Sequence, residues 1–100
     1  MRAVLAGTVI AEVDDAETIV IEGNHYFPPS ALRAGELVES PTPYTCPWKG
    51  ASQYYSLVLD GQTYTDLAWA YPTPYPTAIE KVGRDFSGYL AFDPSVQVGP

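Results

Sequence analysis

The sequence predicts a small all-β fold, built on a curled, barrel-like antiparallel sheet with one or two short helical turns. Ten prolines and eight glycines among 100 residues interrupt the chain too often for a helical bundle. Short runs of β-forming residues alternate with turn signals, which is typical of small β-sandwiches and barrels. The hydrophobic fraction of 46% and the aromatic fraction of 13% exclude a disordered chain. At this length we expect one domain over residues 1–100.

The sequence of the N-terminal part predicts two strands, the second of which begins a hairpin. Residues 7–13 alternate weakly between apolar and polar side chains, and residues 18–22 are rich in β-branched types. Gly23-Asn24 is a two-residue turn signal, since both residue types tolerate positive φ. It returns the chain through residues 25–27.

Most other elements are expected to be short, because proline and glycine flank them. Proline offers no N–H to a strand ladder and stops the returning strand at Pro28. The remaining short elements are a helical turn at 30–33, an edge strand at 36–40, a helix at 77–82 with Thr77 as N-cap, and strands at 88–92 and 96–98.

A central hairpin is the strongest prediction. Residues 52–59 and 62–71 are strand-like and are joined by Asp60-Gly61, which suits the type I′ turn of paired strands. A two-residue turn fixes the register, so Tyr55 should face Asp66 and Ser52 should face Trp69. One face then carries Tyr54, Val58, Leu67, Trp69 and Tyr71, and the other carries Tyr55, Leu57, Leu59, Tyr64 and Asp66.

The same register predicts a candidate site at the open end of this hairpin. It sets Gly50 opposite Tyr71, so residues 46–50 should meet residues 70–72. Glycine would allow the two backbones to approach closely. The convergence gathers both tryptophans, the only thiol and one of two lysines.

Composition excludes several classes of partner. Twelve acidic against five basic residues give a net charge of −7, which opposes binding to nucleic acid or to an anionic membrane. No apolar run approaches the ~20 residues that span a bilayer. The short apolar start, interrupted by Gly7 and Thr8, is interpreted as a first strand and not as a signal peptide.

The lone cysteine and lone histidine set further limits. One cysteine allows no intramolecular disulfide, which favours a reducing, cytoplasmic location. One cysteine and one histidine cannot form a structural zinc site, which needs four such ligands. We therefore expect no metal and no cofactor.

Several motifs together resemble a known family. They are Gly23-Asn24-His25-Tyr26-Phe27-Pro28, Cys46-Pro47-Trp48-Lys49-Gly50, Tyr54-Tyr55, Trp69-Ala70-Tyr71-Pro72 and Gly88-Tyr89-Leu90-Ala91-Phe92. They are similar to those of the domain of unknown function DUF427. The resemblance implies a small, mainly bacterial β-domain of unsettled activity, similar to curled β-tent or Mss4-like folds.

The chain departs from what some labels of that family suggest. The family is sometimes called nucleotidyltransferase-like, but this chain has no Gly-Ser loop followed by an Asp-x-Asp pair and no Gly-rich phosphate cradle. Family members often have a histidine close before the cysteine, whereas Tyr44 and Thr45 precede Cys46 here. That difference weakens a Cys–His catalytic interpretation.

The candidate ligand-binding residues have a structural alternative in each case. The aromatic rings could stack on a flat ligand or surround a cation, or they could form an ordinary aromatic core. Lys49 could hold an anionic ligand, or it could pair with Asp66 or Glu80. The candidate ligand-binding set is Cys46, Trp48, Lys49, Tyr54, Trp69 and Tyr71.

The candidate catalytic residues are Cys46, Lys49 and Asp66. Cys46 is a nucleophile only if Lys49 lowers its pKa, and is otherwise a buried apolar residue. Asp66 is a general base only if burial raises its pKa, and otherwise forms a cross-strand hydrogen bond to Tyr55. His25 is expected opposite Glu22, as a solvated pair on the hairpin.

Three function classes follow. The first is a module that binds a small molecule at the aromatic site, and the second is an enzyme that uses Cys46 or Lys49 there. The third is a protein-interaction module, including a homodimer, that uses an exposed aromatic face or a sheet edge. The sequence ranks small-molecule binding first.

Overall fold

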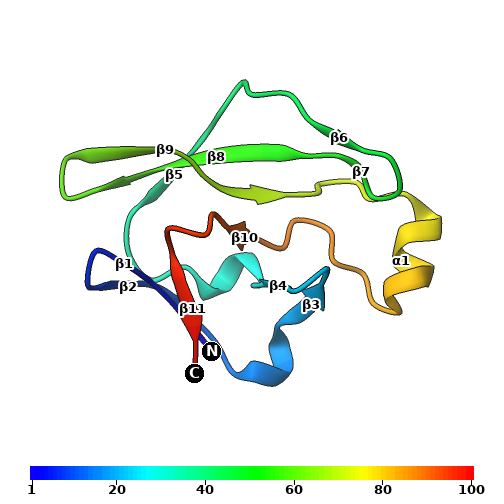
Figure 1. Cartoon of the computed structure of the whole chain (residues 1–100), viewed down its shortest axis with the longest axis horizontal. Coiled ribbons are helices and arrows are strands. Elements are labelled where there is room, and N and C mark those ends of the chain that lie inside the picture. Colours follow the sequence, from blue (N-terminus) through cyan, green and yellow to red (C-terminus); the bar gives the residue numbers. More distant parts are fainter.

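The computed structural model describes residues 1–100 and confirms the curled all-β prediction (Figure 1). Its strands form four small antiparallel sheets, and none of them closes into a barrel. A long central hairpin runs along one side of the molecule, with shorter strands beneath it and the helix at one end. The first and last strands pair, so the two ends of the chain lie side by side.

The largest sheet has the strand order β10-β9-β8-β5 and contains the predicted central hairpin. That hairpin is β8 (Gln53–Leu59) and β9 (Gln62–Ala70). As predicted, β5 (Glu36–Glu39) lies at the edge, beside β8. The predicted strand at 88–92 is shorter than expected, because only β10 (Ala91–Phe92) pairs with β9.

A β-bulge in β9 changes the predicted register. Leu57 pairs with Tyr64 as expected, but Tyr55 pairs with Ala68, so residues 65–67 lie opposite a single residue of β8. Asp66 has a φ of 52°, and its N–H donates to the Ser56 hydroxyl at 3.2 Å. Aspartate tolerates this left-handed conformation better than most residues, which allows the extra residues to be accommodated.

The bulge moves several side chains. Trp69 faces Tyr54 and not Ser52, and Tyr55 does not face Asp66. Leu67 joins the same buried cluster as Leu57, although the unbroken register placed them on opposite faces.

A three-stranded sheet, ordered β11-β1-β2, forms the N-terminal part. It contains β1 (Arg2–Leu5), β2 (Thr8–Glu12) and β11 (Gln97–Gly99). The strand predicted over 7–13 is β2, but β1 was not predicted as a separate strand; Ala6 and Gly7, with φ values of 48° and 82°, form the turn between them. The apolar residues on the two sides of this turn pair with each other.

Two small ribbons complete the strands. In the first, β3 (Ile19–Ile21) pairs with β4 (Asn24–Tyr26). Its turn is Glu22-Gly23, at φ values of 53° and 79°, one residue earlier than predicted. This register sets Ile19 opposite Tyr26, so two buried side chains share the inner face. The second ribbon pairs β6 (Thr45–Cys46) with β7 (Gly50–Ala51).

The helical segments are short. The predicted helix is α1 (Pro76–Val82), and two 3₁₀ turns, η1 (Asp15–Glu17) and η2 (Pro29–Ala31), lie in the N-terminal third. Thr77 is not the N-cap, because Pro76 already begins the helix and proline suits the first helical position. None of these segments has the length and apolar character needed to cross a bilayer.

The buried side chains form two clusters. The first cluster has 13 members, all apolar: Ala3, Leu5, Ile10, Ala11, Phe27, Ala31, Leu57, Leu67, Ala68, Ala70, Leu90, Phe92 and Val96. The second cluster has 8 members: Ile19, Ile21, Tyr26, Cys46, Tyr71, Ala78, Phe86 and Ala91. The second cluster contains the thiol and two buried tyrosines, whereas the first cluster has no polar side chain.

Candidate functional site

The predicted meeting of the thiol-bearing loop with the end of the central hairpin occurs in the structure. Cys46 and Tyr71 both belong to the second cluster, and Trp48 and Trp69 pack against it. The contact is displaced from the predicted register. A side chain at Gly50 would meet the Tyr75 ring and the Thr73 carbonyl oxygen, whereas the sequence set Gly50 opposite Tyr71.

The β6–β7 turn positions the lysine. Cys46 pairs with Gly50 at its base, and Gly50 has a φ of 110°, which glycine adopts without strain. The Lys49 carbonyl oxygen accepts a hydrogen bond from the Tyr75 N–H at 3.0 Å. The loop is thereby attached to the segment that leads into α1.

The Lys49 ammonium is buried among aromatic rings. Lys49 is 5% exposed, and its Nζ lies 5.2 Å from the ring centroid of Trp48 and 4.9 Å from that of Tyr71. Cation–π contacts of this kind contribute about 0.5–2 kcal/mol each, the larger values applying to desolvated sites. Lys49 also forms an ion pair with Glu22, and we call Lys49, Trp48, Tyr71 and Glu22 the Lys49 site.

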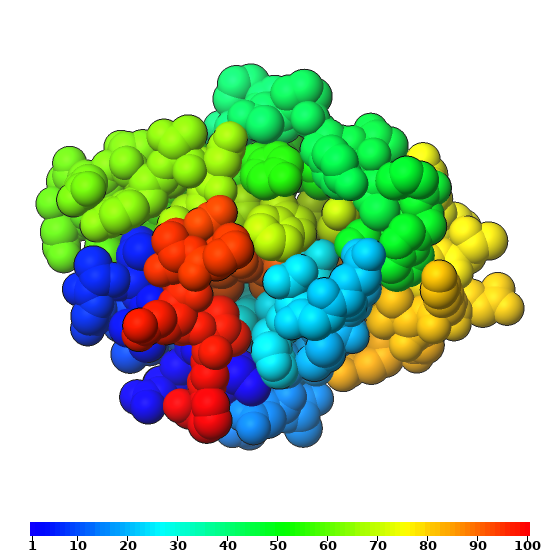
Figure 2. All heavy atoms as spheres, viewed as in Figure 1, coloured from blue at the N-terminus to red at the C-terminus, as the bar shows by residue number.

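The ionic partner is a residue that the sequence did not single out. Lys49 Nζ donates to Glu22 Oε1, whereas the sequence offered Asp66 or Glu80 as partners. Glu22 reaches the lysine because it occupies the tip of the β3–β4 hairpin, which lies against residues 45–51 (Figure 2). The predicted Gly23-Asn24 turn would instead have paired Glu22 with His25.

Burial and pairing affect the pKa values of the pair in different ways. Burial by itself would lower the pKa of Lys49, but the hydrogen bond to Glu22 and the nearby Tyr26 and Tyr71 hydroxyls outweigh it and raise that pKa. The hydrogen bond from Lys49 lowers the pKa of Glu22. Both groups are therefore charged at neutral pH.

A second lysine reaches the same tryptophan. Lys81 Nζ lies 4.7 Å from the Trp48 ring centroid. The chain has only two lysines, and both flank this half-buried indole. The scarcity of lysine was a sequence signal that could have linked Lys81 to the site.

A layer of aromatic side chains lies beneath the lysine. The Trp69 indole N–H donates to the Tyr26 hydroxyl at 3.1 Å, and burial raises the pKa of Tyr71 to about 12. Tyr54 is more distant. The ring centroids of Tyr54 and Trp69 are 6.2 Å apart, but Tyr54 lies outside the second cluster.

Two other candidates are separate from the site. Asp66 lies in the bulge, where its carboxylate accepts a hydrogen bond from the Thr42 hydroxyl at 2.7 Å. Hydrogen bonds from Ser40 and Thr42 lower the pKa of Asp66, which is the opposite of what a general base needs. The expected hydrogen bond from the Tyr55 hydroxyl to the Asp66 carboxylate is not formed. His25 pairs with Val20 and not with Glu22.

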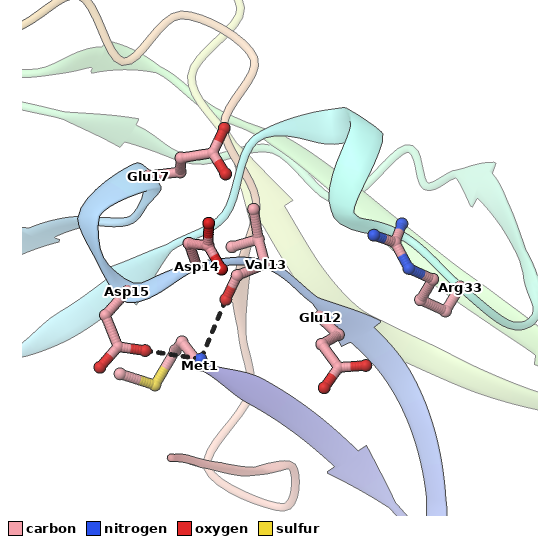
Figure 3. A pocket seen from close by; sticks show the side chains of 7 residues that line it. All are labelled: Met1, Glu12, Val13, Asp14, Asp15, Glu17 and Arg33. Atoms are coloured by element: carbon pink, nitrogen blue, oxygen red, sulfur yellow. Dashed lines mark hydrogen bonds and ion pairs between the residues drawn. The ribbon is translucent and has the colours of Figure 1, made fainter.

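The cavities lie elsewhere. The largest, about 700 Å³, is lined by Met1, Glu12, Val13, Asp14, Asp15, Glu17 and Arg33 (Figure 3). There the amino group of Met1 donates to the Val13 carbonyl oxygen and to the Asp15 carboxylate. Neither of the other two cavities is lined by Trp48 or Lys49, so the Lys49 site is closed in this structure. No group of three or more His, Cys, Asp or Glu side chains converges as metal ligands would.

One of the comparisons with known proteins identifies a family. No curated protein matches the sequence. The family model described as domain of unknown function (DUF427) matches residues 1–98. Because that match covers nearly the whole chain, the protein belongs to the DUF427 family.

Proposed function

We propose that the protein is a binding module that takes a small molecule at the Lys49 site. A single observation carries this proposal. An ammonium group is buried among aromatic rings, and only one carboxylate, which is itself half exposed, neutralises it. The fold supplies both a charge and a flat ring at one place near the surface.

A lysine at this position is not explained by stability. Removing a charge from water is costly, and an apolar pair of similar size is often as stable as a buried ion pair. Ordering a lysine side chain costs further conformational entropy, about 1.5–2 kcal/mol. A costly charge that packing does not require is typical of a binding site, where it recognises an opposite charge.

Each candidate residue has a role in this proposal. Lys49 supplies the charge and Trp48 the flat surface on which a ring can stack. Tyr71 and Trp69 form the aromatic floor, Tyr54 supports Trp69, and Cys46 closes the base of the loop. Since no cavity is lined by Trp48 or Lys49, and Glu22 pairs with the Lys49 ammonium, a ligand group that binds this ammonium has to replace the Glu22 carboxylate.

The enzyme alternative has less support. Lys49 has a raised pKa and is ion-paired, whereas a nucleophilic lysine needs a lowered one. Cys46 is buried, and the only histidine belongs to the β3–β4 ribbon, where it pairs with Val20. We propose a cytoplasmic location, because a lone buried thiol that forms no disulfide suits a reducing compartment.

The interaction alternative, which includes a homodimer, also has less support. The large exposed apolar side chains are few and distant in the sequence: Val20, Val38 and Val98 lie on β3, β5 and β11, and Tyr44 and Tyr75 lie just before β6 and α1. Apolar residues scattered singly over a surface are common in monomeric proteins.

An NMR fragment screen tests the proposal. Compounds with a flat ring are added to the ¹⁵N-labelled protein, and the indole N–H resonance of Trp48, assigned from Trp48→Phe, is followed. We expect some of them to shift this resonance and to raise the melting temperature. Trp48→Ala should abolish both effects while keeping a dispersed spectrum.

Tyr44→Ala is the matched control, because Tyr44 is an exposed aromatic residue just before the same loop. It should leave both effects intact. The proposal would be contradicted if no compound shifted the Trp48 resonance. It would also be contradicted if compounds raised the melting temperature of Trp48→Ala as much as that of the wild type.

A further inference from the structure

The geometry points to a ligand that carries a carboxylate beside a flat ring, and to Glu22 as the group that occupies the carboxylate position when the ligand is absent. This inference rests on the proposed function and names the chemical class that the Lys49 site takes.

The charge balance of the site favours an anion. Two ammonium groups, of Lys49 and Lys81, lie on the Trp48 ring, and Glu22 is the only carboxylate paired with Lys49. The site therefore has an excess positive charge, in a protein whose net charge is −7. An anionic molecule gains a local attraction here that most of the surface does not offer.

The present occupant defines the size and charge of the group that fits. Glu22 presents one singly charged carboxylate to a lysine that is almost completely buried. A ligand carboxylate that replaces it restores the same charge-assisted hydrogen bond, so the buried ammonium is not left unpaired. A doubly charged phosphate is larger and would have to be accommodated by further movement.

Glu22 is placed where it can leave. Its side chain is 54% exposed, and it is attached to a two-residue turn at the tip of a hairpin. Rotation about its side-chain bonds withdraws the carboxylate into solvent without moving the strands. Buried side chains of the second cluster have no such freedom.

The ring position follows from Trp48. The indole is half buried and contacts both ammonium groups. A flat group stacked on it therefore lies next to the position that the Glu22 carboxylate occupies in this structure. Aromatic stacking is favourable beyond the contribution of the apolar area that it buries. A ring and a carboxylate on adjacent atoms would use both features at once.

The test is a titration of four probes against three proteins, followed by NMR at the Trp48 indole. The probes are benzoate, phenyl phosphate, benzyl alcohol and acetate, and the three proteins compared first are wild type, Glu22→Gln and Glu36→Gln, with Lys49→Met as a fourth. Glu36→Gln removes another exposed charge, from the edge strand β5, and serves as the control.

We expect Glu22→Gln to bind benzoate about tenfold more tightly than wild type, because an internal competitor lowers the apparent affinity by the fraction of open sites. Glu36→Gln should match wild type, and Lys49→Met should lose benzoate binding. Benzyl alcohol should bind weakly and equally to wild type and Glu22→Gln. If Glu22→Gln is poorly folded, Glu22→Asp, which keeps the charge but shortens its reach, should tighten benzoate binding by a smaller factor.

The two proposals fail in different ways. If benzoate and benzyl alcohol bind wild type and Glu22→Gln with equal affinity, the ring site exists but the carboxylate inference is overturned. If phenyl phosphate binds more tightly than benzoate, the ligand class is overturned. If no ring-bearing probe shifts the Trp48 resonance in any variant, the proposed function itself fails.

Discussion

The two buried clusters of this small protein differ in what they contain. The first cluster is entirely apolar and joins the N-terminal sheet to the central hairpin. The second contains tyrosine hydroxyls and a thiol, and it borders the buried Lys49. The need to pack apolar side chains is enough to explain the first cluster, but not the second. The polar character of the second is therefore the part of the interior that needs a functional explanation.

Truncation in the first cluster should have the largest effect. Leu57 is 0% exposed, and Leu57→Ala leaves a cavity, so we expect a loss of about 2–5 kcal/mol in the free energy of unfolding. Val38→Ala, at an exposed position on the neighbouring strand, should cost about 0.5 kcal/mol or less. Urea denaturation measures both. Equal effects at the two positions would show that the first cluster does not dominate stability.

Removal of the carboxylate from the Lys49 site should have an intermediate effect. Glu22→Ala leaves the buried ammonium without its ionic partner, which we expect to cost about 1–3 kcal/mol. Glu36→Ala, at an exposed site on β5, is the control and should be nearly neutral. A neutral Glu22→Ala would mean that water or another group already satisfies Lys49.

The same variant should show a defined pH dependence. Because the folded protein lowers the pKa of Glu22, its stabilising contribution is present above the ordinary value of 4.5 and is lost as the pH falls through the folded pKa. The stability difference between wild type and Glu22→Ala should therefore be constant near neutral pH and shrink in acid. A difference that grows as the pH falls from 5 to 3, roughly the range around the glutamate pKa, would contradict the pairing.

The tyrosines offer an independent comparison on the alkaline side. Burial raises the pKa of Tyr71 to about 12, so the stability that it contributes is lost as the pH rises from its ordinary value of 10.0 toward 12. Tyrosinate absorbance should show most of the eight tyrosines titrating before a late component. Tyr71→Phe should reduce the late component, and an unchanged titration would place Tyr71 in water.

The sequence predicted the architecture well because short-range signals determine it. Asp60-Gly61 forms the expected turn, the edge strand β5 lies where it was predicted, and the thiol-bearing loop meets the end of the central hairpin. These features depend on turn chemistry and side-chain alternation, which a single sequence shows directly.

The details that were wrong depend on burial by distant parts of the chain. Nothing local signals the bulge at Asp66, since it has no glycine and its backbone N–H is satisfied by Ser56 on the other strand. The β3–β4 turn shifted by one residue because that register buries Ile19 with Tyr26. The same shift places Glu22 in the turn, where its side chain can reach Lys49 and does not pair across the strands. The ionic partner could not be predicted because it depends on this shift.

The unfolding free energy of Lys49→Met tests most directly whether the buried lysine serves binding and not folding. Methionine fills a similar volume without a charge, and Glu22 can be hydrated because it is half exposed. We predict a stability within about 1 kcal/mol of wild type, or higher, since apolar replacement of a buried pair is often neutral or stabilising. A loss as large as that of Leu57→Ala would contradict this account and make Lys49 a structural residue.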